Sequence, residues 1–455
     1  MKHALPLIAL SIVLLRGAMG GEMRIWTNTS GKLIEAEMIG VDVAKRTVQV
    51  RLKNGAEFEI AIDNLSPPDK AYAKDHWVST PEAPAGTPPA GMPNATPGGI
   101  SVAALQGIPE SYRSRFDPTA RLEAIRRGSG TPEMEAAVVA SLNLFKTSQN
   151  PDGSWGRSNK GAMTGFVLQC FLGHGETADT PESGGTIMKG LLYLIELGKK
   201  NPDGLLTESW AGGKGGAGTY EHAIATTALG EAYLSARMGG KSLPGLRESF
   251  ETAVKTIIKQ QTKTGSWTYG GQTIVYNAGG NSDLSLANWH FQALNIAQAS
   301  GLKIDGLDSC IKKALKYIDS TQTKDGGFGG VNREAHYNQW YLSGGATAGY
   351  LMLSGKSTPV AKRGVQFIAG MMQAEPPDWN KNCNLYSWHG YSNALFLNGG
   401  SEWTTFAKTV MPQILSAQQP DGSFKHGRPD WPAADAADAT YRQALCTLIL
   451  ETFYR

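Results

Sequence analysis

Carboxylates, histidines and aromatic residues recur near the starts of apolar segments in the second half of the chain. The candidates for catalysis are Glu221, His222, Asp283, His290, Asp435 and Asp438, and those for ligand binding are Tyr220, Trp289, His336, Trp340, Trp388 and His389. A carboxylate pair, or a carboxylate with a histidine, can perform acid–base chemistry such as glycoside hydrolysis. Aromatic rings beside polar groups are typical of a carbohydrate or peptide cleft.

Each ionisable candidate also has a structural interpretation. For His222, His290 and His389, the apolar surroundings favour buried, hydrogen-bonded imidazoles over ligands or bases. For the three aspartates, which precede helical runs, the sequence favours capping of helix N-termini over catalysis. No cysteines have the spacing of metal ligands, so we expect neither a metal nor another cofactor.

A turn motif recurs between helical runs and indicates how these residues are positioned. Its copies are QNPDGSWG at 149–156, QQTKTGSWTYGG at 260–271, TQTKDGGFGG at 321–330 and QQPDGSF at 418–424. Each copy follows an amphipathic run and precedes an apolar Gly/Ala-rich one, which is typical of the turn of a helical hairpin. We expect Asp and Gly to reverse the chain, Trp or Phe to cover a helix end, and Gln to cap a neighbour.

Six such hairpins account for most of residues 109–455. The outer helices are predicted at 134–148, 185–198, 249–261, 307–321, 359–372 and 402–418, and the inner ones at 161–173, 219–234, 283–299, 344–355, 385–400 and 435–454. The inner runs are so apolar that only a closed ring buries them fully. The sequence therefore predicts a mainly α fold, an (α/α)6 toroid, with the candidate residues around a central cavity. A cavity filled by Trp289, Trp340 and Trp388 would count against a small-molecule ligand.

The turn residues also carry a resemblance. Q-x-x-x-G-x-W occurs twice, as Gln149, Gly153 and Trp155 and as Gln261, Gly265 and Trp267. This motif makes residues 117–455 similar to squalene-cyclase-like and protein-prenyltransferase-like α/α toroids. Segments 220–233 and 439–455 resemble the secreted squalene-cyclase-like repeat proteins of Planctomycetes and related bacteria, which implies a bacterial source.

The chemistry of those families is not matched. Squalene-hopene cyclases protonate an alkene from a D-x-D-D motif, whereas the third inner helix here opens with Asp283 alone. Protein prenyltransferases place a zinc-binding D-x-C after a GGF-G turn, whereas GGFGG at 326–330 is followed here by NREAHYNQWY. We therefore interpret the toroid as a binding domain for a carbohydrate, lipid or peptide. The alternative is a cavity enzyme, either a polysaccharide hydrolase or lyase or an isoprenoid cyclase.

Residues 21–78 have a different pattern. RTVQVRL and EFEIAI alternate with period two, which predicts a small barrel-like β-sheet, followed by a helical turn after Ser66. The module resembles the Sla homology domain, first type, through Arg24, Trp26, Thr27, Gly31, Lys32, Glu35, Ala36, Glu37, Leu65, Ser66, Asp69, Tyr72 and Trp77. That resemblance implies a protein or peptide partner. The two tryptophans are interpreted as core residues.

The remaining segments indicate where the protein is located and how its two domains are joined. Residues 1–20 have the basic start, apolar run and small residues of a secretory signal, which predicts a periplasmic or extracellular protein. Because Arg16 is unusual there, an uncleaved anchor is the alternative, and no later stretch is predicted to span a membrane. Residues 79–108 form a Pro/Gly/Ala-rich linker.

The net charge limits the classes of partner, and the positions of the cysteines bear on whether a disulfide forms. Forty-three basic against forty acidic residues leave a net charge of +3, which does not favour nucleic acid or an anionic membrane as a partner. Of the four cysteines, Cys170 and Cys446 fall in inner helices that would be neighbours in a closed ring. Two buried thiols are expected there, with a disulfide as the alternative.

Overall fold

The structure is a computed structural model. It describes residues 23–27, 33–42, 47–52, 57–75, 112, 114–208, 217–239, 243–268, 282–329, 339–427 and 438–455. The chain divides into two compact units, residues 1–88 and 89–455, which are described separately. The predicted signal and linker lie outside the described residues, as do Trp77, His336 and Asp435.

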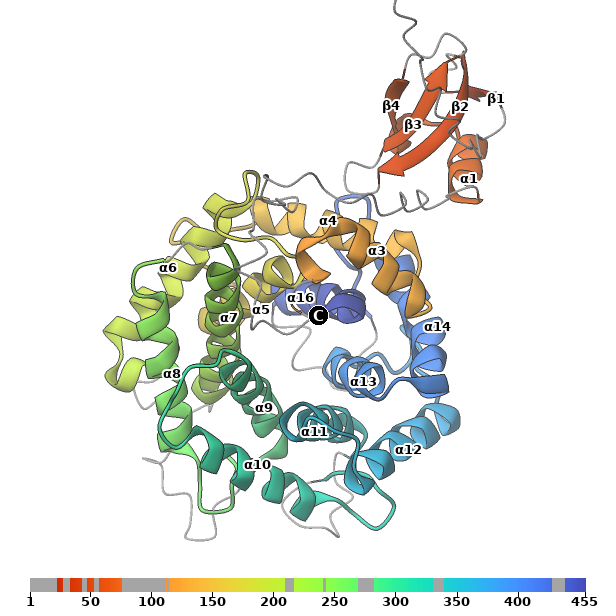
Figure 1. The fold of residues 1–455 in the computed structure, drawn as a ribbon. Helices are drawn as coiled ribbons and strands as arrows, with labels where there is room; N and C mark the ends of the chain where they lie inside the picture. Colours follow the sequence, from red (N-terminus) through yellow and green to blue (C-terminus); the bar gives the residue numbers. More distant parts are fainter. Residues whose placement is uncertain are drawn as a thin grey trace, which may run out of the picture. The chain divides into compact units, whose positions relative to one another are not determined.

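The N-terminal unit contains a four-stranded antiparallel sheet in chain order (Figure 1). Its strands are β1 (Met23–Thr27), β2 (Leu33–Asp42), β3 (Thr47–Leu52) and β4 (Glu57–Ala61), followed by α1 (Pro67–Asp75). The alternation of period two buries Trp26, Val48 and Val50 together with Ala73 of α1. The predicted sheet, the helical turn after Ser66 and the core position of Trp26 are confirmed. Closure of the sheet into a barrel stays a prediction.

A partly buried ion pair holds α1 to this sheet. The Asp69 carboxylate accepts hydrogen bonds from Arg24 Nη2 and from the Thr27 backbone N–H, each at 2.7 Å. The Arg24 guanidinium lies 3.6 Å from the ring centre of Tyr72 and 4.8 Å from that of Trp26. These contacts compensate the burial of the carboxylate, so the residues behind the family resemblance have a structural role here.

The second unit is a ring of six helical hairpins (Figure 1). Its outer helices are α4 (Pro132–Thr147), α6 (Gly184–Lys200), α8 (Leu246–Gln260), α10 (Leu307–Thr321), α12 (Pro359–Ala374) and α14 (Gly400–Ala417). Its inner helices are α5 (Lys160–Gly173), α7 (Ala217–Gly239), α9 (Leu284–Ala299), α11 (Gln339–Ser354), α13 (Leu385–Asn398) and α16 (Ala439–Leu450). The last inner helix packs against α4 and α5, so the ring closes and the predicted toroid is confirmed. A lead-in helix, α3 (Pro118–Arg127), precedes the first hairpin.

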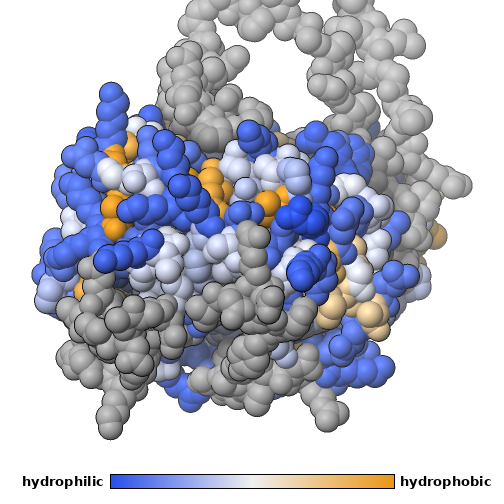
Figure 2. Space-filling model, turned by 90° about the horizontal axis from the view of Figure 1, so that it is seen from below, coloured by the Kyte–Doolittle hydropathy of each residue, from blue (hydrophilic) through white to orange (hydrophobic). Residues whose placement is uncertain are grey.

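The two rings of helices differ in how much of each helix is buried. On outer helix α10, burial recurs at Leu307, Cys310, Ile311 and Ala314, which is the stripe of an amphipathic helix. On inner helix α5, every residue from Gly161 to Gly173 is buried. Figure 2 shows hydrophilic residues over most of the coloured surface on one side of the molecule, with apolar residues in separate patches.

The glutamine of each turn motif joins one hairpin to the next. Gln149 Nε2 donates to the carbonyl of Gly153 within its own turn and to that of Thr186 in α6, both at 2.9 Å. The equivalent bonds to the next outer helix run from Gln261 to Cys310, from Gln322 to Val360 and from Gln418 to Ala137. Because Ala137 belongs to α4, the last of these bonds closes the ring.

Tryptophan and glycine have the predicted mechanical roles in these turns. Trp155 Nε1 donates to the carbonyl of Phe145 at 2.8 Å, and Trp267 Nε1 to that of Ile257 at 2.9 Å, so each indole covers the end of the preceding helix. Gly153 has φ +86°, and a Cβ there would lie 2.6 Å from the carbonyl oxygen of Lys189. Both the backbone angle and this close approach favour glycine.

Candidate functional site

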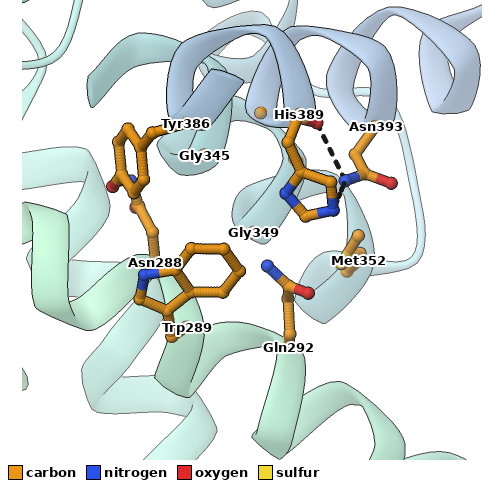
Figure 3. A pocket seen from close by; sticks show the side chains of 11 residues that line it. Asn288, Trp289, Gln292, Gly345, Gly349, Met352, Tyr386, His389 and Asn393 are labelled. Carbon is orange, nitrogen blue, oxygen red and sulfur yellow. Dashed lines mark hydrogen bonds between the residues drawn. The ribbon is translucent and has the colours of Figure 1, made fainter. Parts of the chain in front are cut away.

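A pocket lies between the inner helices α9, α11 and α13 (Figure 3). Its polar and aromatic walls are Asn288, Trp289, Gln292, Tyr386, His389 and Asn393. The cavity volume open to water-sized groups is about 10 Å³. That volume is close to the minimum that holds one water molecule. The pocket therefore accommodates a single small group rather than a whole ligand.

Glycines in α11 and α13 form the wall of this pocket. A Cβ on Gly344 would lie 2.7 Å from the carbonyl carbon of Gly390, and a Cβ on Gly390 would lie 2.7 Å from the backbone nitrogen of Gly345. The two helices therefore approach more closely than side chains would allow. Gly345 and Gly349 also leave part of the wall without side chains, and this allows the amide of Asn288 to pack against α11.

Aromatic side chains of three inner helices contact one another next to the pocket. Trp289 packs edge-on against Phe166 of α5 at 5.1 Å, and Phe166 packs edge-on against Tyr441 of α16 at 5.8 Å. The first and third inner helices thus meet through their side chains. These large apolar side chains gain more from contact with one another than from exposure to water, so the ring is narrowed at this level. The central cavity itself stays a prediction.

The amide of Asn288 has a fixed orientation. Tyr386 Oη donates to the carbonyl of Ser285 at 3.0 Å, so its oxygen accepts the hydrogen bond from Asn288 Nδ2 at 2.8 Å. A carbonyl cannot donate, which determines the direction of both bonds. Asn288 is 4% exposed, and its Oδ1 has no hydrogen-bond partner among the residues that the structure describes.

His389 is fixed by Asn393 in the same way. Asn393 Nδ2 donates to the backbone carbonyl of His389 at 2.9 Å and to its Nε2 at 3.2 Å. Burial, together with the positive charge of Arg455, lowers the pKa of His389 to about 3. The imidazole is therefore neutral at physiological pH, with its proton on Nδ1. Its ring stacks on Trp289 with the centroids 5.6 Å apart.

Glu221 and His222 are fully buried and bonded within the chain. Glu221 accepts hydrogen bonds from the Gly161 N–H at 3.1 Å and from Thr207 Oγ1 at 3.0 Å, and burial raises its pKa to about 7. His222 accepts from the Leu206 N–H at 3.1 Å and bonds the Ala253 carbonyl at 3.0 Å. Burial lowers the pKa of His222 to about 4, and the predicted buried, hydrogen-bonded histidine is found at this position.

The described aspartate candidates cap helices, as predicted. Asp283 accepts from the backbone N–H groups of Ser285 at 2.8 Å and Leu286 at 3.2 Å at the start of α9. Asp438 accepts from the N–H of Thr440 at 2.9 Å at the start of α16 and from that of Arg157 at 2.8 Å. Neither aspartate lines the pocket.

The other candidates lie outside the pocket lining. His290 stacks on Trp267 with the centroids 4.4 Å apart and bonds the Leu286 carbonyl at 3.0 Å. The remaining positions are simple packing or hydrogen-bonding sites: Tyr220 bonds Ser285 Oγ, Trp340 packs against Tyr391, and Trp388 is buried against Trp379.

Among the described candidates, only Trp289 and His389 line this pocket. Sequence reasoning missed its amides, Asn288, Gln292 and Asn393, as well as Tyr386. Asn288 precedes Trp289 directly, and Asn393 follows His389 by one helical turn. Amides at such positions in otherwise apolar helices are the signal that would have identified them.

A group of buried charges on the other side of the ring was also not anticipated. Arg455 Nη2 lies 2.9 Å from Glu231 Oε1, and Arg455 Nη1 lies 3.4 Å from Glu451 Oε2. Arg115 adds a second cation 3.5 Å from Glu231. Burial raises the pKa of Glu451 to about 8, although the neighbouring Arg455, His174 and Arg115 oppose that shift.

His174 belongs to the same charged region. Its Nε2 lies 3.1 Å from Glu135 Oε1, and its Nδ1 lies 3.3 Å from Glu176 Oε1. Burial and Arg121 lower the pKa of His174, but the two carboxylates outweigh them and raise it to about 8. Burial alone would raise the pKa of Glu135, yet His174 and Arg121 lower it to about 2. His174 is thus a cation between two anions, unlike His389.

Three further observations concern metals, membranes and thiols. Within the described ranges, no three His, Cys, Asp or Glu side chains are grouped so that they could hold a metal ion. None of the described helices combines the length and apolar content needed to cross a bilayer. All four cysteines are buried thiols that form no disulfide, and Cys170 Sγ donates to the Ala444 carbonyl at 3.6 Å. The interpretation of Cys170 and Cys446 as two buried thiols is confirmed, and the disulfide alternative is wrong.

No protein-family model and no curated protein matches the chain. Solved structures with a similar arrangement include the type II terpene cyclase MstE from Scytonema without ligand, at 13% identity, with a TM-score of 0.44 over 70% of this chain and 98% of that chain. A wild-type glycosidase is similar at 12% identity, with a TM-score of 0.43 over 70% of this chain and 96% of that chain. At these scores neither likeness carries an argument about function.

Proposed function

We propose that the toroid is a recognition domain that binds a neutral polar group of its ligand in the pocket between α9, α11 and α13. The observation that carries this proposal is the composition of the pocket. Three amides, two aromatic rings and the neutral His389 form its polar and aromatic walls, and no lining side chain is charged. Such a surface matches a neutral ligand that forms hydrogen bonds.

The same composition counts against catalysis in the pocket. A general acid or base works best with a pKa near the operating pH, and the pKa of His389 is about 3. Glu221 has a pKa of about 7, as a catalytic acid would. However, both of its oxygens accept hydrogen bonds from its own chain, and it is fully buried. The cavity-enzyme alternative, a hydrolase, lyase or isoprenoid cyclase, therefore lacks a carboxylate in this pocket.

A thermal-shift screen of the full chain tests this proposal. Neutral sugars, amides and peptides are compared with matched acids and amines, and a ligand at a hundred times its dissociation constant should stabilise by about 2.7 kcal/mol. Ala348→Val adds methyl groups to the pocket wall, whereas Ala299→Val makes the same change on α9 outside the lining. We expect stabilisation by neutral ligands to be lost only in Ala348→Val. Stabilisation by charged ligands alone, or equal responses of the two variants, would show that the proposal is wrong.

We further propose that the N-terminal sheet closes into a Sla-type barrel and contacts a protein or peptide. Ile25 and Leu33 are 58% and 67% exposed, and Leu33 pairs with Thr27, which places the two apolar side chains diagonally on one face. A photo-crosslinking residue in place of Leu33 should capture a partner. The same residue in place of the exposed Asp63 should not capture it. The same capture from both positions would contradict this contact.

Export is proposed on the signal-like residues 1–20. Expression in a bacterium with fractionation should place the protein in the periplasm or medium, with a new N-terminus after Gly20. A cytoplasmic protein that keeps Met1 would contradict export, and an envelope-bound protein that keeps Met1 would favour the anchor alternative.

A further inference from the structure

We propose that the outer faces of α10 and α12 bind an anionic polysaccharide. Figure 1 shows both helices on the outside of the ring, one after the other around its edge, and Figure 2 views the molecule from their side. The pocket lies among inner helices, so this surface is separate from it. Binding here is a second function, which goes beyond the proposed recognition in the pocket and does not depend on it.

Basic side chains form a band along these two helices. The described residues between 307 and 374 include seven basic and three acidic ones, whereas the whole chain is nearly balanced at 43 to 40. The acidic residues are Asp308, Asp319 and Asp325. All seven basic residues are exposed: Lys312, Lys313, Lys316, Lys324, Lys356, Lys362 and Arg363. The small net charge of the chain therefore conceals a positive region.

The band is continuous from one helix to the next. Lys312 and Lys316 are one helical turn apart on α10, which places their side chains next to each other. Lys324 lies in the turn that follows α10. That turn packs against the first part of α12, because a Cβ on Gly326 would lie 2.7 Å from the Arg363 carbonyl oxygen. The charges of α12 thus continue the row that begins on α10.

Several exposed basic residues elsewhere on the outer helices have acidic partners. Lys199 of α6 lies 2.7 Å from Glu196, and Lys259 of α8 lies 2.8 Å from Asp203. Within the described part of the chain, none of the seven basic residues of the band forms such an ion pair. Like charges one turn apart on a helix repel each other, and an anionic partner removes this repulsion.

The residue types in the band disfavour a protein or a single-stranded nucleic acid as the partner. Six of the seven basic residues are lysines, which act as hydrated point charges. Protein interfaces instead favour aromatic residues, methionine and arginine over lysine. Single-stranded nucleic acids stack their bases on exposed aromatic rings. Among the described residues, neither α10 nor α12 exposes a large hydrophobic side chain.

The shape of the band disfavours stiff partners. It follows the convex outer edge of a ring (Figure 1), whereas a bilayer is flat and a DNA duplex is straight over such a length. Helices that lie in a membrane surface also insert apolar side chains, which this band lacks. A polysaccharide chain bends along the edge and brings one carboxylate, sulfate or phosphate group after another to the ammonium groups.

Isothermal titration of the full chain tests this proposal. The probes are a galacturonic acid oligomer and a sulfated dextran oligomer, each compared with its neutral counterpart, the methyl ester or the unmodified dextran. We expect at least one anionic oligomer to bind about tenfold or more tightly than its neutral counterpart, and to lose this advantage as the salt concentration rises, because counterions are released on binding.

Two matched triple variants separate the band from the net charge. Both replace lysine by glutamine, whose helix propensity is similar, so both should fold. The band variant combines Lys312→Gln, Lys316→Gln and Lys362→Gln, and the control combines Lys199→Gln, Lys259→Gln and Lys408→Gln at exposed positions of α6, α8 and α14. Affinity for the anionic oligomer should fall about tenfold or more in the band variant and less than about threefold in the control.

Three outcomes would overturn the proposal. The first is that neither anionic oligomer binds more tightly than its neutral counterpart. The second is an equal loss of affinity in the two triple variants, which would assign the binding to net charge rather than to the band. The third is tighter binding of polyglutamate, a DNA oligonucleotide or phosphatidylglycerol vesicles that is lost in the band variant, which would assign the band to that partner instead.

Discussion

The two sides of the inner ring bury polar side chains in opposite ways. On the side of α5, α7 and α16, Arg455 pairs with the Glu231 carboxylate, so opposite charges neutralise one another inside the chain. Glu451, whose pKa is raised to about 8, lies beside this pair. On the side of α9, α11 and α13, the polar groups are neutral, and Asn288 Oδ1 is left without a partner. Single atoms of Glu231 and Glu451 also lack hydrogen bonds, but each carboxyl has a cation beside it.

This difference explains which side can serve a ligand. Removing one member of a buried ion pair leaves an uncompensated charge, which costs several kcal/mol, so the charged side must stay closed around its own partners. An unpaired amide oxygen costs less, about 1–3 kcal/mol. The charged side therefore has a structural role, and the recognition function that we propose is assigned to the neutral side.

The largest effect on stability is expected from a substitution that removes the buried cation Arg455. Arg455→Met leaves the Glu231 carboxylate without its closest cation, so the free energy of unfolding should fall by about 3–5 kcal/mol in urea denaturation. Adding Glu231→Gln should restore part of this loss. Lys199→Met removes an exposed pair with Glu196 and should change stability by less than about 1 kcal/mol. A loss in Arg455→Met no larger than in Lys199→Met would remove the contrast between the two sides.

The next prediction compares how His174 and His389 make the stability of the protein depend on pH. The pKa of His174 is raised to about 8, so its stabilising contribution is complete below its ordinary pKa and is lost as the pH rises through about 8. The pKa of His389 is lowered to about 3, so it reduces stability as the pH falls below its ordinary pKa. Relative to the unchanged protein, His174→Gln should lose about 2 kcal/mol near pH 6 and less near pH 9.

The opposite sign is expected on the pocket side. His389→Gln should gain about 2 kcal/mol relative to the unchanged protein near pH 5 and nothing near pH 8. Both variants are followed by urea denaturation across this pH range. Parallel pH profiles for the two substitutions would contradict the assignment of one charged and one neutral histidine.

The smallest effect tests the glycine wall of the pocket. A Cβ on Gly345 would meet the Asn288 amide inside contact distance, so Gly345→Ala should cost about 1–3 kcal/mol. In an Asn288→Ala background most of that cost should disappear, which a double-mutant cycle measures. Gly370→Ala on α12, where a Cβ meets nothing within 4 Å, should instead gain about 0.5–1 kcal/mol. Additive effects of Gly345→Ala and Asn288→Ala would show that the wall does not position this amide.

Much of the fold could be predicted because its signals are local. The turn motifs predicted the hairpins, the roles of Gln149 and Trp155, and the closure of the ring. Asp283 and Asp438 cap helices as their positions before apolar runs indicated. The strands of the N-terminal module followed from period-two alternation. The sequence signals for these features lie within one or two turns of each other, although the bonds of Gln149 and Gln418 to neighbouring hairpins join residues 37 and 281 positions apart.

The pocket could not be predicted in the same way. Whether Phe166 meets Trp289 depends on how far two non-neighbouring inner helices lie apart, and the approach of α11 to α13 depends on Gly344 and Gly390 facing each other. The sequence shows that Asn288 and Asn393 are polar but not which partners direct their amides. The burial of Arg455 beside Glu231 likewise joins residues far apart in the chain.

By itself, the sequence determined the repeated hairpins, their order and the closed ring, because helix periodicity and turn chemistry act over short distances. Only the tertiary structure decided that His174 is a cation and His389 is neutral, and that Phe166 meets Trp289 across the ring while a small neutral pocket stays beside them. The physical reason is that charge state, hydrogen-bond direction and free volume are set by what surrounds a side chain, and those neighbours come from distant parts of the chain.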